Sequence, residues 1–245
     1  MMTWLRNNWF YLLVLVVALL VPLFITNRYH SQVITMSCLF AIGALSLNLI
    51  LGYTGQASLA HGGFFAIGAY GVAILTHTYG WNFWIALPAG ALLSALIGFL
   101  VGMPALRTRG SYFAIATMCL GEIIHLIAGN WMEVTGGHNG IVGIPLPSPI
   151  TIPGVGQLTF QSQAAQYYLV LFFLLLTLFV MYRVVNSLRG RTFLATAINE
   201  DLAEAVGINT FRTKLLSFVV GNFFAGLAGG IDRKSTRLNS SHVSQ

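Results

Sequence analysis

Long apolar runs joined by short polar links make up most of this sequence, and they restrict its possible folds more than any other feature. Charged residues account for 7% of the 245 residues, whereas a typical soluble domain contains about 25%. A soluble fold of this size would leave much of its surface apolar, because so few charged residues are available to cover it. The sequence therefore predicts an all-α, polytopic transmembrane helical bundle. A transmembrane β-barrel does not fit, because the apolar runs are continuous and do not alternate with polar residues.

Seven apolar runs are candidates for membrane spans. They cover about residues 9–25, 33–51, 64–75, 83–103, 112–128, 167–182 and 215–231. The first run is longer than most signal-peptide cores and no small-residue cleavage site follows it, so we expect an uncleaved first span. Residues 1–231 are thus expected to form one transmembrane domain surrounded by the lipid bilayer.

The basic residues predict how this domain is oriented. Arg107 and Arg109 follow the fourth run, and a polar segment at residues 187–214 carries the largest group of charges. Both groups are expected on the cytoplasmic side, because Lys and Arg are enriched in cytoplasmic loops. Two spans lie between them, so the two assignments agree, and counting back places the N-terminus in the cytoplasm. The net charge of +6 follows from this distribution and does not indicate a nucleic-acid partner.

The polar segment at residues 187–214 contains seven of the charged residues, which comprise 12 Lys and Arg and 6 Asp and Glu. Its middle predicts one helix over residues 194–206, with an apolar face and an acidic face. Gly207 is expected to end this helix, because glycine takes the left-handed conformation at little cost. Such a helix between two spans is typical of a surface bound by another protein; the alternative is a solvated helix in a loop. The apolar face consists of Leu194, Ile198, Leu202 and Ala205, and the acidic residues are Glu200, Asp201 and Glu204.

Residues 52–63 (GYTGQASLAHGG) join the second and third runs and are rich in glycine without any formal charge. Irregular backbone at membrane depth is tolerated only where it is buried in protein or lines a cavity. Such a joint is typical of a broken or re-entrant element, which marks the pathway in transporters. The alternative is a tight helical hairpin packed through small residues. The possible pathway residues are Asn48, Gly52, Gly55, Gln56, His61, Gly62, Gly68 and Glu122.

Glu122 and His125 lie inside the fifth run, three positions apart and therefore on one helix face. An ionisable residue within a span is costly and suggests a functional site. A dimetal site built from Glu-x-x-His would need a second such motif and further carboxylates, which the other runs lack, so no metal site is expected. We expect Glu122 to hydrogen-bond Ser, Thr or backbone groups of a neighbouring helix. His61, alone in the glycine-rich joint, is expected to form local hydrogen bonds and not to bind a ligand.

No catalytic or nucleotide-binding motif accompanies these features. The sequence lacks the GxxxxGK[ST] phosphate loop, so the chain is not expected to bind ATP itself, and it also lacks GxSxG and HExxH. The scattered His and acidic residues argue against a polytopic membrane enzyme. We therefore expect a transport protein, with no cofactor of its own.

The last fourteen residues differ abruptly from the rest of the chain. Residues 232–245 (DRKSTRLNSSHVSQ) are basic and rich in serine, and they resemble translated vector or adapter sequence. We expect this tail to be non-native, the alternative being a genuine disordered tail. If it is non-native, the natural chain is expected to continue into further spans.

Four segments together resemble the permease subunits of branched-chain amino acid ABC importers of the LivM type. They are residues 45–75 (LSLNLILGYTGQASLAHGGFFAIGAYGVAIL), 105–124, 130–145 and 190–230, in the order and spacing of that family. The resemblance implies one half of a heterodimeric pore in the bacterial inner membrane, paired with a companion permease. It further implies two cytoplasmic ATP-binding subunits that hydrolyse ATP, and an extracytoplasmic substrate-binding protein.

The resemblance also implies a role for the polar segment, which is similar to the family's ATPase-docking loop. In that loop an acidic residue precedes a glycine by six positions, as Asp201 precedes Gly207 here, and Ala203 matches one of the family's alanines. Leu202 and Asp201 stand where Ala and Glu are commoner, and His125 stands where relatives often have Arg. The implied docking residues are Leu194, Ile198, Glu200, Asp201, Ala203, Glu204 and Gly207.

The resulting hypothesis is a permease subunit that moves branched-chain or related aliphatic amino acids inward by alternating access, driven by separate ATPase subunits. The main alternative is an ion-coupled secondary transporter or channel in which Glu122 is the coupling carboxylate. That alternative predicts transport by this chain without an ATPase and a requirement for a membrane gradient.

Overall fold

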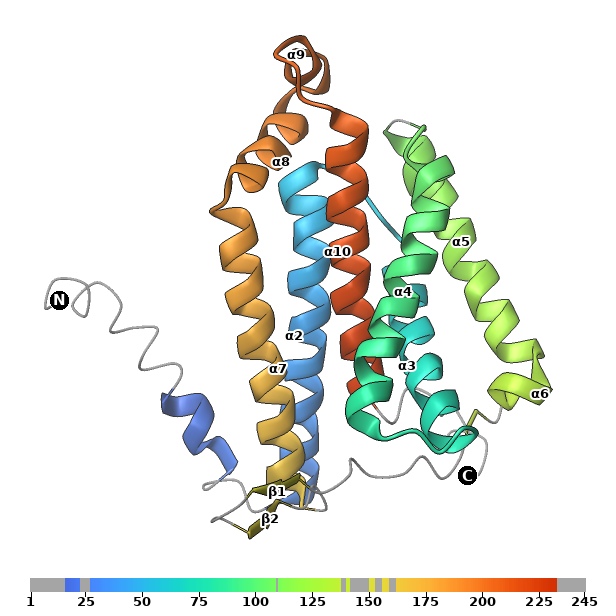
Figure 1. The fold of residues 1–245 in the computed structure, drawn as a ribbon, viewed down its shortest axis with the longest axis vertical. Helices are drawn as coiled ribbons and strands as arrows, with labels where there is room; N and C mark the ends of the chain where they lie inside the picture. The colour runs from blue at the N-terminus through green and yellow to red at the C-terminus, as the bar shows by residue number, and fades with distance from the viewer. Residues whose placement is uncertain are drawn as a thin grey trace, which may run out of the picture.

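The protein is a bundle of long helices that run alongside one another (Figure 1). The structure is a computed structural model and describes residues 16–22, 27–108, 110–137, 140–141, 150–152, 156–158 and 162–232. Residues 16–22 are helical. The helices that follow are α2 (Arg28–Thr54), α3 (His61–His77), α4 (Phe83–Ala105), α5 (Ser111–Asn130), α6 (Met132–Thr135), α7 (Gln163–Val185), α8 (Leu188–Ile198), α9 (Glu200–Ala205) and α10 (Thr210–Ile231). The strands β1 (Ile150–Ile152) and β2 (Gly156–Leu158) pair antiparallel in a short hairpin between α6 and α7.

Five of the described helices, α2, α4, α5, α7 and α10, are long and apolar enough to cross a membrane by length and composition. They contain five of the seven predicted spans, so the predicted all-α transmembrane class is confirmed. The predicted span at residues 64–75 lies in α3, which has 17 residues and is shorter than the other five. Of the predicted first span, only residues 16–22 are among the described residues, and these are helical. Arg109 and the tail after Asp232 lie outside the described residues.

Asparagine side chains begin three of the long helices. The side-chain oxygens of Asn27, Asn82 and Asn209 accept hydrogen bonds from backbone N–H groups in the first turns of α2, α4 and α10, at 3.0, 3.1 and 2.9 Å. These N–H groups have no partner within the helix, so a side-chain acceptor at this position stabilises the helix end. The polar links between the apolar runs therefore also set where the helices begin.

The helix α10 occupies the centre of the bundle and packs against α2, α3 and α4. Its C-terminal half is rich in glycine and alanine, and these residues are buried. A Cβ atom at Gly68 of α3 would collide with the backbone of Gly226, and one at Gly229 would collide with the backbone of Phe65. Glycine at these positions lets the backbones approach closely, which is a common basis of helix packing in membranes.

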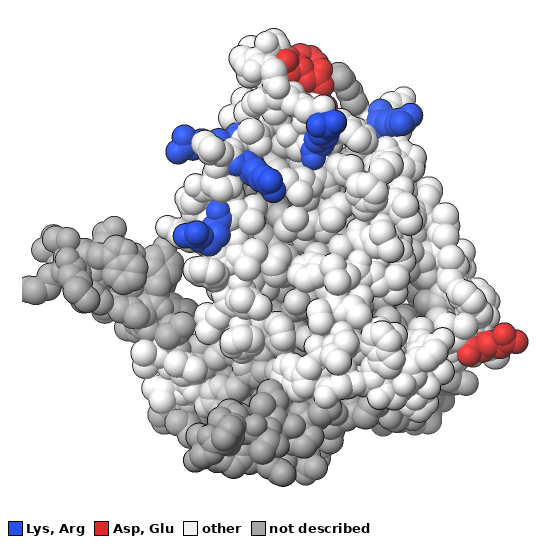
Figure 2. Space-filling view, in the orientation of Figure 1, with Lys and Arg blue, Asp and Glu red and all other residues white. Residues whose placement is uncertain are grey.

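The two ends of the bundle differ in charge. The helices α8 and α9 form one end, and α6 lies at the other with the β1–β2 hairpin (Figure 1). Figure 2 shows Lys and Arg side chains gathered over the α8–α9 end. The described basic residues near that end are Arg107, Arg183, Arg189, Arg191, Arg212 and Lys214.

The single helix predicted over residues 194–206 is wrong, because the chain forms two helices there. Asn199 separates α8 from α9 in an extended conformation (φ −155°, ψ 109°). Its side-chain oxygen accepts a hydrogen bond from the backbone N–H of Leu202 at 3.0 Å and caps α9. Asparagine favours this capping conformation over the helix interior, so its local hydrogen bond overrides the apolar periodicity on which the prediction rested.

Gly207 ends α9 as predicted. Its φ is +87°, the N–H of Gly207 donates to Glu204 O at 2.9 Å, and the N–H of Ile208 donates to Ala203 O at 3.0 Å. This pair of bonds is the Schellman motif, which satisfies carbonyl groups at the end of a helix and needs a left-handed residue.

The irregular joint predicted at residues 52–63 is shorter than expected. The helix α2 continues through Gly52 and ends at Thr54, where Gly55 takes the left-handed conformation (φ +69°). The helix α3 begins at His61, so Gly62 lies in its first turn. Only residues 55–60 are therefore non-helical. Gly52 and Gly62 adopt helical backbone conformations, and Gly55 is the one glycine of this stretch with a positive φ.

Candidate functional site

The outer surface of α8 and α9 carries exposed apolar side chains, and the exposed Arg191 lies among them. We call it the α8–α9 face and define it by five residues, whose exposed fractions run from 42% to 84%: Leu188 78%, Leu194 42%, Ile198 84%, Leu202 63% and Val206 71%. It contains three of the residues predicted for the apolar face, and the fourth, Ala205, is exposed as well. An exposed apolar surface of this kind marks an interaction site.

The opposite side of these helices is buried and attaches them to the bundle. Phe193 is 1% exposed and packs with Leu49, Met181 and Phe224, which come from α2, α7 and α10. A Cβ atom at Gly190 would collide with the backbone of Val185, so glycine is needed at the sharp turn from α7 into α8. The α8–α9 face is therefore held in a defined position on three spanning helices.

Two of the three acidic residues in α9 bind α10. Glu200 forms an ion pair with Lys214, with 2.6 Å between Oε2 and Nζ. Glu204 accepts a hydrogen bond from the hydroxyl of Thr210 at 2.6 Å, and both Glu204 and Asp201 are exposed. The acidic face thus helps to fix α9 against the start of α10. Ala203 is 3% exposed and serves as a packing residue.

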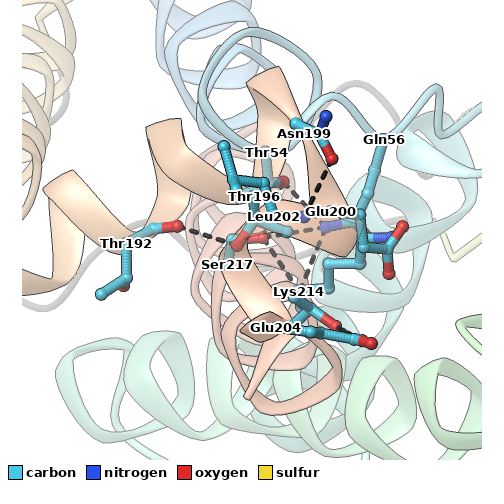
Figure 3. Close-up of polar contacts among 11 residues, drawn as sticks. Thr54, Gln56, Thr192, Thr196, Asn199, Glu200, Leu202, Glu204, Lys214 and Ser217 are labelled. Atoms are coloured by element: carbon cyan, nitrogen blue, oxygen red, sulfur yellow. Dashed lines mark hydrogen bonds and ion pairs between the residues drawn. The ribbon is translucent and has the colours of Figure 1, made fainter. Parts of the chain in front are cut away.

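A buried polar cluster continues from Lys214 into the joint between α2 and α3 (Figure 3). The side-chain amide of Gln56 donates to the hydroxyls of Thr54 and Ser217 at 2.8 and 3.2 Å, and contacts the backbone oxygen of Lys214 at 3.4 Å. The hydroxyls of Thr54 and Ser217 are themselves 3.0 Å apart. Thr54, Gln56 and Ser217 are at most 5% exposed. The cluster therefore connects the end of α2, the joint and the start of α10.

The joint is non-helical, and buried residues alternate with exposed ones along it. Alternate residues Gln56, Ser58 and Ala60 are buried, and the backbone N–H of Leu59 donates to the hydroxyl of Thr117 on α5 at 3.1 Å. The helices α2 and α3 pack mainly on other helices and contact each other little. This arrangement resembles the broken element more than the tight hairpin, because α2 and α3 pack little against each other.

The helix α3 begins level with the middle of α5. A Cβ atom at Gly121, halfway along α5, would lie 3.4 Å from the Cα of Ala60. Ala60 precedes α3 and makes no side-chain hydrogen bond to its first turn. The α3 N-terminus thus lies partway along the spanning helices, in the position of a discontinuous helix.

The helix α8 touches the joint directly. A Cβ atom at Gly55 would lie 3.6 Å from the Cα of Ala197 in α8. A cleft of about 460 Å³ opens beside the joint, lined among others by Gln56, Phe113 and Lys214. A displacement of α8 would therefore reach the joint without an intervening layer of residues.

The structure does not gather the predicted pathway residues into one cavity. Asn48 and Gly52 are exposed on α2, and Gly62 is exposed at the start of α3. Gly68 is buried where α3 crosses α10. Glu122 is exposed on α5 and forms none of the expected hydrogen bonds within the described residues.

His61 forms local hydrogen bonds, as predicted. Its Nε2 atom lies 2.7 Å from the hydroxyl of Ser46 and 3.1 Å from the backbone oxygen of Gly43, both in α2. These contacts attach the start of α3 to α2. Within the described residues, no group of three or more His, Cys, Asp or Glu side chains is arranged to hold a metal ion.

Sequence reasoning missed Thr54, Ser217 and Phe193 as members of this site. Polar residues near span ends beside a glycine-rich joint were the available signal for Thr54 and Ser217. Nothing in the local pattern around Phe193 distinguishes it from the exposed apolar residues of the same helix.

The comparisons with known proteins agree with this architecture. The family described as "Branched-chain amino acid transport system / permease component" matches residues 29–241, a range that extends past Asp232 into the tail. The high-affinity branched-chain amino acid transport system permease protein LivM of Salmonella typhimurium and that of Escherichia coli are each 36% identical over 241 residues, covering 91% of this chain. The permease protein LivH of the same Salmonella system is 28% identical over 211 residues, covering 80% of this chain and 67% of LivH.

The chain spans 56% of the length of the LivM proteins that it matches. No solved structure is significantly similar to it. The family match covers most of the chain, and the LivM identity extends over nearly all of it. The chain therefore belongs to the family of permease components of branched-chain amino acid transport systems.

Proposed function

We propose that this chain is the membrane-spanning permease subunit of an ATP-driven importer for branched-chain or related aliphatic amino acids. Separate cytoplasmic subunits would hydrolyse ATP, a companion permease would complete the pore, and an extracytoplasmic binding protein would deliver the substrate. Family membership supports this proposal, together with the absence of a phosphate loop in the sequence. The names of the LivM relatives supply the substrate class.

The α8–α9 end would lie in the cytoplasm of a bacterial cell, with the protein in the inner membrane. Basic side chains gather at that end (Figure 2), and cytoplasmic loops are enriched in Lys and Arg. This orientation would expose the α8–α9 face to the compartment that contains ATP. The N-terminus would also be cytoplasmic.

The observation that carries the proposal is the exposed α8–α9 face on two short helices anchored to the bundle. A soluble protein that covered this face would bury five large apolar side chains, and each contributes about 1.5–3 kcal/mol on full burial. The exposed Asp201 lies next to Leu202 of that face. We assign the docking of the ATPase to this face. Glu200, Ala203 and Glu204 fix α9 against the bundle, and Gly207 ends this helix.

Movement of the docked ATPase would reach the joint through two routes. The first is the close approach of Gly55 to Ala197, where an added Cβ atom would reach ordinary contact distance. The second runs from Glu200 to Lys214 and then to Gln56 (Figure 3). Both routes end at the non-helical residues 55–60, whose reorientation would shift the start of α3 and thereby alternate the access of the pathway.

The pathway would present mainly apolar groups to the aliphatic side chain of the substrate. The α3 N-terminus could receive the substrate carboxylate, because helix N-termini carry partial positive charge. Asn48, Gly52 and Gly62 lie on exposed surfaces of α2 and α3 near this point and would face the pathway.

Co-purification followed by ATP-dependent uptake tests the proposal. Ile198→Lys places a charge on the most exposed apolar side chain of the face, at 84% exposure, so folding should be unaffected. We expect the variant to insert in the membrane normally, to lose the co-purifying ATPase and to lose ATP-dependent uptake in vesicles. Arg189→Ala, an exposed position on the same helix, is the matched control and should retain both.

Two results would contradict the proposal. Normal ATPase association of Ile198→Lys would show that the α8–α9 face is not the docking surface. Uptake by the isolated chain that follows an ion gradient and ignores ATP would favour the secondary transporter, in which Glu122 couples the ion.

A further inference from the structure

One face of α5 carries ionisable side chains in the middle of a membrane span. The helix α5 packs mainly against α3, and its other side is exposed. We call this side the α5 face and define it by five exposed residues: Met118, Cys119, Glu122, His125 and Leu126. Glu122 and His125 are residues 12 and 15 of the 20 that form the helix (counting from Ser111), so neither lies in its first or last turn.

The exposed faces of the other peripheral spans are different. Halfway along α4 the exposed residues include Leu92 and Leu96, and halfway along α7 they include Phe172 and Leu176. Both helices lack ionisable residues in their central turns. Apolar faces of this kind suit direct contact with lipid. Among the described spanning helices, α5 alone exposes a carboxyl group and an imidazole at mid-span.

Contact with lipid would be unfavourable for this pair. Ionisable residues within spans almost always face other protein or a water-filled cavity, because lipid offers no hydrogen bonds. Within the described residues Glu122 has no hydrogen bond that would offset this cost. The α5 face therefore needs a polar partner that reaches the middle of the membrane.

We propose that the companion permease packs on the α5 face and supplies polar groups for Glu122 and His125. This inference rests on the proposed function. Of the partners proposed there, the ATPase and the binding protein lie outside the membrane, whereas the companion permease reaches mid-span. The chain is similar to both LivM and LivH, two permease proteins whose names give the same kind of transport system.

The proposed contact between α5 and the companion permease lies next to the joint. Gly121, next to Glu122, packs against Ala60, and a Cβ atom at Gly63 would press on Ile124 of α5 at 2.9 Å. The companion would therefore lie beside the start of α3. The pathway near this helix end would then be enclosed between the two permeases and not within this chain alone.

Site-specific photo-cross-linking tests the contact in membranes that contain the complete transporter. A photoreactive p-benzoylphenylalanine replaces Met118, which is 62% exposed on the α5 face, and in a control replaces Phe172, which is 60% exposed on α7. We expect a cross-link to the companion permease from position 118 and at least a tenfold lower yield from position 172. Equal yields, or a cross-link from position 118 to a second copy of this chain, would overturn the proposal.

The variant Glu122→Leu gives a second test, because contact with lipid and contact with the companion permease predict different effects of removing the carboxyl group. If the α5 face contacts lipid, removal of the carboxyl group stabilises the chain and leaves assembly unchanged. On our proposal the companion permease binds about 3- to 30-fold more weakly, the range expected for loss of a polar contact between membrane helices. Phe172→Leu on α7 is the control, for which we expect unchanged assembly.

ATPase association separates failure of this inference from failure of the proposed function. If the ATPase co-purifies but position 118 cross-links only to lipid, the α5 interface is wrong while the permease function stands. If neither the ATPase nor the companion associates with the chain, both are wrong. Cross-linking in the otherwise unchanged chain remains decisive even if Glu122→Leu fails to accumulate.

Discussion

Lys214 connects the α8–α9 end of the molecule to the joint through both its side chain and its backbone. Its ammonium group pairs with Glu200, and its carbonyl oxygen contacts the amide of Gln56. The side chains of Lys214 and Glu200 are 13% and 25% exposed, so the ion pair is partly shielded from solvent. A pair in this environment constrains the position of α9 more than a fully exposed pair would.

Lys214→Met removes the charge and keeps most of the side-chain length. We expect it to lower the free energy of unfolding by about 1 kcal/mol, because Glu200 is left without its partner. ATPase association should persist, since Phe193 still anchors α8, whereas ATP-dependent uptake should fall. Thermal unfolding in detergent and vesicle uptake measure the two effects.

A double-mutant cycle with Glu200→Gln separates the ion pair from other effects of Lys214→Met. We expect the double variant to be less destabilised than the sum of the two single variants, because contacting residues couple. Additive effects would show that the ion pair does not stabilise the α8–α9 end of the molecule. Arg189→Met, which removes an exposed basic residue at the same end, should change neither quantity.

At the scale of elements, the joint at residues 55–60 depends on one left-handed glycine. Gly55 has φ +69° and lies against Ala197 of α8 at ordinary contact distance. An alanine at position 55 would be strained because the position has a positive φ, whereas its Cβ atom would collide with no neighbouring residue. The turn between α3 and α4 supplies a matched position, since Gly80 has φ +66° and a Cβ atom added there would meet no other atom within 4 Å.

Gly55→Ala and Gly80→Ala should therefore cost similar stability, about 1–2 kcal/mol each, because both force alanine into the left-handed region. Only Gly55→Ala should also reduce uptake per folded molecule, since it alters the joint that α8 contacts. The measurement is uptake normalised to folded protein, alongside thermal unfolding. Equal uptake by the two variants would show that the joint has no role in transport.

At the scale of the whole molecule, the bundle has two ends that the orientation rule assigns to opposite sides of the membrane. Ala205 is exposed on α9 at one end, and Thr78 is exposed after α3 at the other. The proposed orientation places Ala205 in the cytoplasm and Thr78 outside.

Single cysteines at these positions test the orientation. In a background with Cys38→Ser and Cys119→Ser, we expect a membrane-impermeant maleimide to label Thr78→Cys in intact cells. Ala205→Cys should react only in inside-out vesicles. Labelling of Ala205→Cys from outside the cell would invert the proposed topology and would separate the α8–α9 face from the cytoplasmic ATPase.

The transmembrane class and most helix positions could be read from the sequence. Transfer of long apolar runs from water to lipid is favourable whatever the packing, so composition alone determines which segments span. Glycine at position 207 ended its helix as predicted because the left-handed conformation is a local property of that residue. The single helix at residues 194–206 was predicted wrongly. The apolar periodicity favours one helix, but the local capping bond of Asn199 divides it into two.

The site itself depended on contacts between residues far apart in the chain. Gln56 meets Ser217 across 161 positions and Lys214 across 158, and neither contact is visible in any local pattern. The sequence by itself determined that this protein lives in a membrane, where its spans lie and which segment is polar, because these follow from the chemistry of neighbouring residues. Only the tertiary structure decided that the apolar side of α8 and α9 faces outward, that two acidic residues bind α10 and that Glu122 lies on an uncovered face, because helix packing selects which side of each helix is buried.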